Sequence, residues 1–417
     1  MFVTNWISPT KIQKISEITN FFRHYFLSRT EVMRYKNAMK IGILTLPLNS
    51  NYGGVLQAYA LQTVLKRMGH DVLEVELKKN LRWQYPPLWK MPLSFGKRLL
   101  FKYIVRRKNQ KILLERYERK IYPLLVHDIL EFISKYIKQF KVDKFIDCKG
   151  KFDAFVCGSD QIWRYKYYPF FEGDIANVYL KFLGDDSCKR IAYAASFGTD
   201  NWEYPAKETA ECKNWIQKFD AVSVREETGV KLCSTYYDIK AKHVLDPTML
   251  LSKDDYVALI EKSDVPKSKG NLFCYILDNT DEKMNVVKNI EKQRHLSSFF
   301  MNGDCGNWTE DLEKRIQPPV ESWLRAFYDS EFIVTDSFHA CVFSILFHKQ
   351  FLVVGNKERG LARIYSLLSM FGLEDRLTSD TDLDINKFES IDYDRVDEIL
   401  AKYREDSRTF LIESLSL

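Results

Sequence analysis

A histidine and an aspartate stand three residues apart where an apolar run is interrupted. The segment from Phe332 to Val334 predicts a buried strand, and the run from Ala340 to Phe347 predicts a buried helix. The turn between them would lie at the carboxyl edge of a parallel sheet, where α/β proteins bind ligands. His339 would then sit in the first helical turn, beside backbone N–H groups that have no helical partner. This position favours anion binding together with proton transfer; the alternative is that Asp336 merely caps the helix.

Further polar residues follow other expected strands. We expect these to face the same cleft: Arg225, Ser159, Asp160, Gln161, Ser337, Arg359 and Arg363. Arginine forks match both phosphate and carboxylate groups, so arginines beside one histidine suit transfer chemistry on a donor that carries both. No metal site is expected, because the remaining histidines are scattered without ligand spacing. A serine nucleophile elbow is also not indicated, since the sequence has no G-x-S-x-G.

A glycine pair lies between a predicted strand at 41–45 and a predicted helix at 55–68. The loop that joins them ends in Asn51, Tyr52, Gly53 and Gly54. Two glycines at a helix N-terminus allow a charged ligand group to approach the backbone closely. The sequence matches neither a G-x-G-x-x-G nor a Walker A pattern. Both a binding loop and a plain tight turn therefore remain open.

Length and composition indicate a globular protein with two lobes. The chain has 417 residues, 46% of them hydrophobic, and a net charge of +6. This mild charge fits an anionic substrate or membrane surface better than nucleic acid, for which no recognition motif is present. The eight cysteines form no C-x-x-C pair, which is typical of a reducing cytosol. No apolar run is long enough to span a bilayer, so we expect a cytoplasmic protein, with peripheral membrane contact as an option.

Alternation of apolar strands and helical segments predicts an α/β fold with parallel sheets. We expect two Rossmann-like lobes that face each other across a cleft. The expected divisions are an amphipathic helical extension at 1–39, a first lobe at 40–250, a second lobe at 251–390 and a C-terminal helix at 391–417. A basic helical insertion at about 97–140 interrupts the first lobe. The extension and the insertion each have two interpretations, packing or solvation on the body and contact with an anionic membrane.

Six motifs in order resemble those of the polysaccharide pyruvyl transferase family, over roughly 40–377. They are Ile41–Leu44 with Asn51–Ala58, Gly158–Trp163, Ala192–Gly198, Ser223–Glu226, Leu245–Thr248 and Thr335–His339. The resemblance implies a fold similar to GT-B glycosyltransferases. It implies transfer of pyruvate from phosphoenolpyruvate to two hydroxyls of a sugar, giving a ketal and free phosphate without a cofactor. Acceptors in this family are commonly lipid-linked glycan precursors for surface polysaccharides such as capsule or exopolysaccharide.

The same resemblance assigns roles to individual residues. Arg225 would hold the phosphate or carboxylate of the donor, and His339 would be the acid and base. Many family members carry Arg-Leu-His where this chain has Ser337, Phe338 and His339. We expect Arg359 or Arg363 to supply the missing charge. Independently of the family, we interpret Asp336 as the carboxylate partner of His339.

Two other functions compete with this interpretation. A GT-B glycosyltransferase that uses a nucleotide sugar would need residues in the second lobe to hold the diphosphate, and Glu358 with Arg359 fits that pattern. A non-catalytic scaffold would instead organise a glycan-assembly complex at the membrane through 1–39 and 97–120.

Overall fold

The computed structural model describes residues 38–78, 91–104, 114–301, 303, 305, 310–355, 361–380 and 384–416. The extension predicted at 1–39 lies almost entirely outside these residues. So do Arg359 and the part of the basic insertion at 105–113. All other predicted site residues are described.

The first lobe is built on a seven-stranded sheet in which every neighbouring pair is parallel. Its strand order is β3-β2-β1-β4-β5-β6-β7. The strands are β1 (Lys40–Leu44), β2 (Asp71–Leu77), β3 (Gln139–Val142), β4 (Ala154–Cys157), β5 (Lys189–Ala195), β6 (Ala221–Val224) and β7 (Lys242–His243). The first six follow the Rossmann order. In this order the sequence of neighbouring strands reverses between β1 and β4, while all strands stay parallel.

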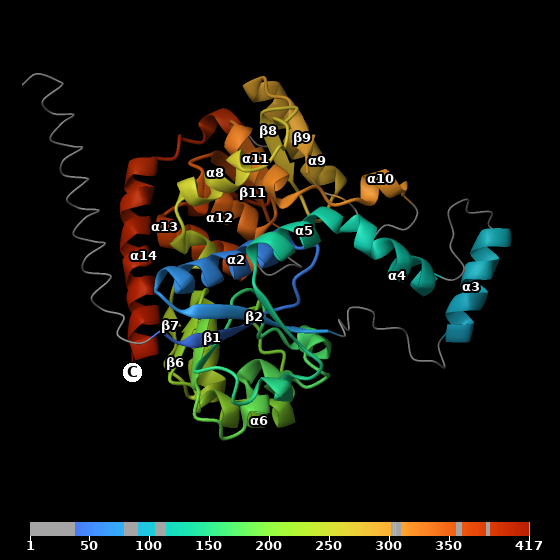
Figure 1. Ribbon diagram of the computed structural model, residues 1–417. Coiled ribbons are helices and arrows are strands. Elements are labelled where there is room, and N and C mark those ends of the chain that lie inside the picture. Colours follow the sequence, from blue (N-terminus) through green and yellow to red (C-terminus); the bar gives the residue numbers. More distant parts are fainter. Residues whose placement is uncertain are drawn as a thin grey trace, which may run out of the picture.

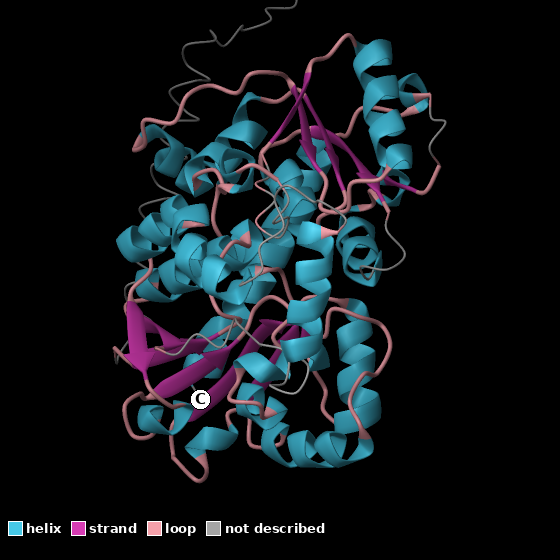
Figure 2. Ribbon diagram, turned by 90° about the vertical axis from the view of Figure 1, so that its right-hand side faces the viewer, coloured by secondary structure: helices cyan, strands magenta, loops and turns pink. Residues whose placement is uncertain are grey.

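The second lobe contains a parallel five-stranded sheet in the order β12-β11-β10-β8-β9. Its strands are β8 (Leu272–Tyr275), β9 (Ser298–Phe300), β10 (Phe332–Thr335), β11 (Gln350–Val354) and β12 (Leu377–Thr378). This is the flavodoxin-like doubly wound order, which reverses between β8 and β10. The prediction of an α/β protein with two Rossmann-like lobes is therefore confirmed, and Figure 2 shows the two sheets separated by helices.

Helices cover both sheets and fill the space between them. They are α2 (Tyr52–Arg67), α3 (Met91–Tyr103), α4 (Leu114–Leu125), α5 (His127–Tyr136), α6 (Ala206–Ile216), α7 (Glu227–Leu232), α8 (Lys253–Glu261), α9 (Asp281–Arg294), α10 (Leu312–Arg315), α11 (Val320–Asp329), α12 (Phe338–Leu346), α13 (Leu361–Phe371) and α14 (Tyr393–Ser416). One of them corrects the expected boundaries. Because α2 already begins at Tyr52, the glycine pair belongs to its first turn and not to a loop.

The two lobes share one hydrophobic core. A single cluster of buried residues contains side chains from α2 of the first lobe and from α11 and α12 of the second. Tyr52 stacks on Trp323 with ring centroids 5.4 Å apart, and its hydroxyl donates to the Pro318 carbonyl at 2.7 Å. Burial of aromatic rings across the junction fixes how the carboxyl edges of the two sheets face each other.

The C-terminal helix holds the lobes together from outside. Figure 1 shows α14 running along the side of both lobes. Phe410 packs beside Tyr193 of β5 with ring centroids 6.2 Å apart, and the Ser407 hydroxyl accepts a hydrogen bond from the Leu245 amide at 3.0 Å. A helix that follows the second sheet in sequence therefore stabilises the first.

Truncation of a buried leucine on α14 is expected to weaken the whole fold. Leu411 is fully buried in the shared core, so Leu411→Ala removes apolar contacts and leaves a cavity. We expect a loss of about 2–5 kcal/mol in the free energy of unfolding, measured by denaturant titration. The control is Glu413→Ala on the exposed side of the same helix, which should stay within about 0.5 kcal/mol of wild type. Equal stability of the two variants would contradict this role of α14.

Candidate active site

A cavity of about 780 Å³ lies between the carboxyl edges of the two sheets. Its first-lobe wall comes from the segments after β1 and β4, and its second-lobe wall includes the segments after β8 and β10. Each pair of strands flanks the point at which its sheet reverses strand order. Ligands of doubly wound sheets bind at such points, so the topology of both lobes selects the same space.

His339 lies at the start of α12, as the sequence predicts. The Ser337 side chain caps this helix by accepting a hydrogen bond from the Ala340 amide. His339 lines the cavity, with a side chain that is only 8% exposed. Its ring lies against the first turn of α2, where a Cβ atom on Gly53 would stand 2.0 Å from Nδ1. Gly53 also lines the cavity, and the absence of a side chain there makes room for the imidazole of His339.

Arg225 occupies the centre of a buried charge cluster behind His339. Its guanidinium donates to Asp246 Oδ2 at 2.7 Å through Nη1 and to Asp160 Oδ1 at 2.9 Å through Nη2. Nη1 also lies 3.5 Å from Nε2 of His339, and the guanidinium stacks on the Phe338 ring at 4.5 Å. The Arg225 side chain is 0% exposed. In this arrangement Arg225 organises the residues around it and does not face the cavity.

Asp246 is the carboxylate beside the histidine. Its Oδ2 atom lies 3.7 Å from Nε2 of His339, while its Oδ1 atom accepts hydrogen bonds from the amide and hydroxyl of Thr248. Burial alone would raise the pKa of the Asp246 carboxyl. The nearby imidazole of His339, together with the charge of Arg225, holds this pKa far below its usual value. Asp246 is therefore ionised next to the imidazole and can orient it.

The predicted pairing of Asp336 with His339 is wrong. Asp336 Oδ1 accepts from the Leu277 amide at 2.7 Å, and Oδ2 accepts from the Asp278 amide at 3.0 Å and from Lys283 Nζ at 2.6 Å. These three donors fix the loop after β8 to the loop after β10. Asp336 lines the cavity, but both of its oxygens accept hydrogen bonds from the loop after β8 or from Lys283 of α9.

The predicted residues after β4 have separate roles. Ser159 is fully buried, and its hydroxyl donates to the Ala194 carbonyl at 2.9 Å and to Asp246 at 3.3 Å, so it supports the charge cluster. Asp160 lines the cavity and has a positive φ of 54°. Burial would raise the pKa of its carboxyl, but the charges of Arg225, His339 and Arg363 outweigh burial and lower it. Gln161 lines the cavity and accepts from Arg164 at 3.0 Å.

The remaining predicted residues lie on either side of the cavity. Asn51 lines it and donates from Nδ2 to Asp160 Oδ2 at 3.4 Å. A Cβ atom added to Gly54 would have the side-chain amide nitrogen of Asn51 as its nearest neighbour, so Gly54 lies behind Asn51. Arg363 of α13 lines the cavity 5.9 Å from the centre of the Phe338 ring. Burial, with the nearby charge of Arg225, lowers the pKa of Arg363 to about 10.

Several functional candidates are missing from the sequence-based prediction. Asp246 belongs to the motif Leu245–Thr248, but its contact with His339 joins residues from the two lobes. Arg164 and Lys166 follow directly after the motif Gly158–Trp163 and bring positive charge to the cavity wall. Their position within three residues of the end of the motif is a signal that could have identified them. Phe300 of β9 also lines the cavity, and its strand has only three residues, too few for a clear pattern.

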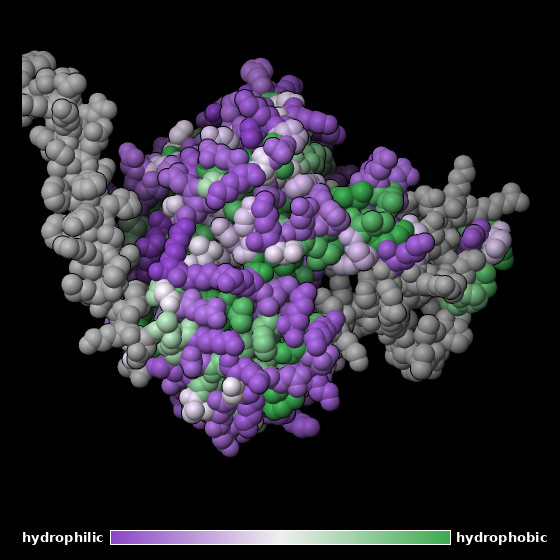
Figure 3. Space-filling model, viewed as in Figure 1, coloured by the Kyte–Doolittle hydropathy of each residue, from purple (hydrophilic) through white to green (hydrophobic). Residues whose placement is uncertain are grey.

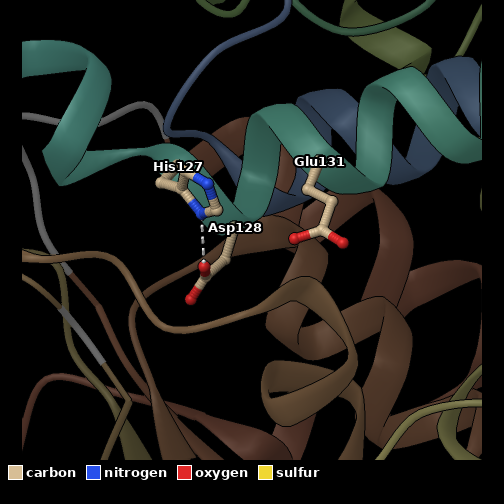
Figure 4. A group of neighbouring side chains, drawn as sticks. All are labelled: His127, Asp128 and Glu131. Atoms are coloured by element: carbon tan, nitrogen blue, oxygen red, sulfur yellow. Dashed lines mark hydrogen bonds and ion pairs between the residues drawn. The ribbon is translucent and has the colours of Figure 1, made fainter.

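Three potential metal ligands gather elsewhere on the surface. Figure 4 shows His127, Asp128 and Glu131 at the start of α5, with a hydrogen bond of 3.0 Å between the first two. Their ligand atoms lie within 4.8 Å of one another. The three side chains are close because they stand at neighbouring positions on one helix, and both His127 and Glu131 are exposed. It is separate from the residues that line the cavity.

Two facing Rossmann-like lobes with a polar cavity between their switch points define a GT-B-like protein. The family model for polysaccharide pyruvyl transferase matches residues 51–358, which is most of the chain. The chain therefore belongs to the polysaccharide pyruvyl transferase family and is an enzyme of that class. The match includes both walls of the cavity from Asn51 to His339 and ends before Arg363. None of the curated proteins matches the chain in sequence.

Solved structures resemble the chain only at the level of the fold. The UDP-GlcNAc 2-epimerase from Neisseria meningitidis bound to UDP-GlcNAc is 12% identical, with a TM-score of 0.43 over 90% of this chain and 99% of that one. A putative UDP-N-acetylglucosamine 2-epimerase from Listeria monocytogenes is 10% identical, with a TM-score of 0.44 over 89% and 97%. The heptosyltransferase WaaC from E. coli with ADP is 11% identical, with a TM-score of 0.35 over 88% and 100%.

A methyl group at Gly53 is expected to disable the site without unfolding the protein. In Gly53→Ala the new Cβ atom collides with the His339 ring, which must move away from Asp246. A displacement of about 1 Å at a catalytic group can cost about 100-fold in turnover, and we expect a loss of that order. Overpacking at a buried site costs about 1–3 kcal/mol, so thermal stability should fall while the protein stays folded.

Gly54→Ala is the matched control for this substitution. At this position the nearest atom would be the Asn51 side-chain nitrogen at 3.3 Å, and that side chain can shift. We expect turnover close to wild type in steady-state assays. Equal activity of the Gly53 and Gly54 variants would show that the close approach of His339 to α2 has no catalytic importance.

Proposed function

We propose that the protein transfers pyruvate from phosphoenolpyruvate to two hydroxyl groups of a sugar in a glycan precursor. The products are a pyruvate ketal and phosphate. The observation that carries the proposal is the position of His339, an imidazole between an ionised aspartate and a large cavity with basic residues in its wall. Family membership supplies the reaction class, and this geometry gives each step a group that can perform it.

Positive charge in the cavity supports a donor with two anionic groups. The phosphate and carboxylate of phosphoenolpyruvate bring about three negative charges at neutral pH. Arg164, Lys166 and Arg363 line the cavity, so they are the candidates to bind these groups. Arg363 stands in place of the arginine that Ser337 replaces. Arg225, proposed from the sequence as a donor ligand, acts instead through Asp160 and Asp246, because its guanidinium is already bound by both.

His339 moves the protons of the reaction. A proton is added to C3 of phosphoenolpyruvate, and the first sugar hydroxyl loses its proton as its oxygen bonds to C2. The bond from C2 to the phosphate oxygen then breaks, and the second hydroxyl bonds to C2 and closes the ketal. One hydroxyl proton balances the proton gained by C3, and the other leaves with the phosphate. An imidazole suits both transfers because its two forms interconvert near neutral pH. Asp246 orients it for them.

A lipid-linked acceptor at the inner face of a membrane is a further part of the proposal. Helix α3 carries Lys97, Arg98 and Lys102 next to exposed apolar side chains, and Figure 3 shows both kinds of residue on it. These exposed side chains are Phe95, Leu100, Tyr103 and Ile104. This combination suits an anionic lipid surface. Among the described residues, no helix has the length and apolar character needed to cross a bilayer.

A second apolar area supports the same orientation. Leu124 is 56% exposed on α4, Leu312 is 40% exposed on α10, and Ile316 is 38% exposed. Figure 3 shows hydrophobic surface over α4 and α10, on the side of the molecule that carries α3. Ile316 precedes Gln317, which lines the cavity. A lipid-linked sugar could therefore enter the cavity while its lipid stays at this surface.

Loss of the imidazole is expected to abolish ketal formation. His339→Ala should lower turnover by about 100- to 10,000-fold, because one acid–base group typically contributes that much. The assay is phosphate release from phosphoenolpyruvate with a panel of lipid-linked sugars. The control is His348→Ala, because His348 pairs with Asp397 on the surface and should be dispensable. Wild-type ketal formation by the His339 variant would refute the mechanism.

Ligand-induced thermal stabilisation separates the proposal from its alternative. Phosphoenolpyruvate should stabilise the wild-type protein, whereas a nucleotide-sugar glycosyltransferase would respond to nucleotide sugars. The residues proposed for that alternative, Glu358 and Arg359, lie outside the described part of the chain. Arg363→Ala should reduce the stabilisation by phosphoenolpyruvate. A response to nucleotide sugars alone would favour the glycosyltransferase. Cells that carry a His339 variant and still attach pyruvate to their surface glycans would favour the scaffold.

Reversal of the basic charges on α3 is expected to release the protein from anionic vesicles. Each Lys or Arg near an anionic surface contributes about 1 kcal/mol, so replacing Lys97, Arg98 and Lys102 by Glu should weaken binding on the order of 100-fold. Flotation with vesicles of phosphatidylglycerol and phosphatidylcholine measures this. Replacing Lys149, Lys207 and Lys240, which are exposed elsewhere, is the charge-matched control. Equal losses of vesicle binding in both variants would show that net charge, and not the position of α3, determines binding.

A further inference from the structure

The cavity has two chemically different ends. Arg164 and Lys166 of the first lobe and Arg363 of the second make one part of its wall basic, and their charges lie close enough for Arg164 to lower the pKa of Arg363. The wall formed by the ends of β8 and β9 is different. Its described lining consists of Tyr275, Ile276, Leu277, Asn279 and Phe300, with Gln317 from the segment before α11; Asp336 beside them is paired with Lys283.

Phe300 is unusual among the aromatic residues of the second sheet. Alternation along β9 turns Phe299 into the core, where it stacks on Phe273 with ring centroids 5.3 Å apart. Phe300 points to the other side and is 43% exposed in the cavity wall. An exposed ring beside amide side chains suits a ligand that has both an apolar face and hydroxyl groups. The pyranose ring of a sugar has this combination.

The neighbouring wall is held rigidly. Asp336 binds the Leu277 and Asp278 amides and Lys283 Nζ, so the loop that carries Leu277 and Asn279 is fixed to the start of α12. That helix also carries His339. The distance between this wall and the imidazole is therefore set by hydrogen bonds, which a two-step attack by neighbouring hydroxyls requires.

Charge decides what this end can bind. The anionic donor is expected beside Arg164, Lys166 and Arg363, of which Arg164 also pairs with Glu203 at 3.4 Å. Among the described lining residues, no further Lys or Arg remains to neutralise a diphosphate. A volume of about 780 Å³ leaves ample room beside a donor as small as phosphoenolpyruvate. Around Phe300 the described lining offers ring and amide contacts, which suit an uncharged group.

We infer that the wall around Phe300 is the acceptor subsite, and that it binds an uncharged hexose residue stacked on the Phe300 ring. The inference rests on the proposed function, because it assumes that the donor occupies the basic end. It identifies the acceptor as a sugar remote from any phosphate, such as an outer residue of an oligosaccharide. A nucleotide sugar or a sugar attached directly to a diphosphate would not be the preferred acceptor.

The experiment compares acceptor and donor kinetics in three variants. The probes are p-nitrophenyl hexosides and N-acetylhexosaminides of both anomeric forms, with UDP-hexoses as charged counterparts. In Phe300→Ala we expect the acceptor KM to rise about ten-fold or more while the apparent KM for phosphoenolpyruvate stays unchanged. Phe300→Trp should retain the wild-type acceptor KM. Tyr328→Ala, which removes a ring that is 46% exposed outside the cavity lining, should have no effect.

Each other outcome has a distinct meaning. An unchanged acceptor KM in Phe300→Ala, or a parallel rise in the donor KM, would overturn the subsite while wild-type pyruvyl transfer upheld the proposed function. A preference for UDP-hexoses over uncharged glycosides would overturn the assignment of an uncharged acceptor. A wild-type protein that neither binds phosphoenolpyruvate nor releases phosphate with any probe would overturn the subsite and the proposed function together.

Discussion

The pairing of Arg225 with two buried aspartates is the interaction on which the site depends. Arg225, Asp160 and Asp246 come from the ends of three different segments of the first lobe, and their charges compensate one another away from water. Removing one partner of such a group leaves an uncompensated buried charge, at a typical cost of about 3–5 kcal/mol. The cluster also provides the surface against which the second lobe places His339. The cluster therefore fixes position and charge, and its neighbours rather than Arg225 line the cavity.

This constraint explains why the lobes meet so closely. The imidazole can reach Asp246 only if α12 of the second lobe approaches the first turn of α2, and Gly53 permits that approach. The stacking of Tyr52 on Trp323 and the contacts of α14 hold the lobes in the required arrangement. Packing far from the cavity thus determines the distance between His339 and Asp246.

Local patterns predicted much of the fold and one half of the site. Apolar runs that end in polar residues identified β1, β4, β5, β6 and β10, because strands buried on both faces have continuous apolar sequences. The same patterns placed Asp160 and His339 at sheet edges. Short strands such as β9 and β12 escaped prediction because two or three residues carry no periodicity. Their position depends on tertiary contacts.

Partners across the junction could not be predicted from local patterns. Asp336 precedes His339 by three residues, and proximity in sequence suggested a pair. The chain between them turns, however, and directs the Asp336 carboxylate towards two backbone amides after β8. Asp246 is 93 residues away in sequence and lies beside the ring. Only the relative placement of the two lobes, which depends on the shared core, brings this carboxylate to the histidine.

The electrostatic environments of two buried arginines differ, and the difference indicates which of them suits an anionic ligand. The pKa of Arg225 is raised, because the charges of Asp246, Asp160 and Glu226 outweigh its burial. The pKa of Arg363 is lowered to about 10, because burial and the charge of Arg225 outweigh the carboxylates of Asp160 and Glu226. An anion beside Arg225 would meet three carboxylates, whereas an anion beside Arg363 would stabilise a guanidinium whose charged form burial disfavours. Electrostatics therefore separate a guanidinium that builds the site from one suited to bind the donor, although both lie within reach of the Phe338 ring.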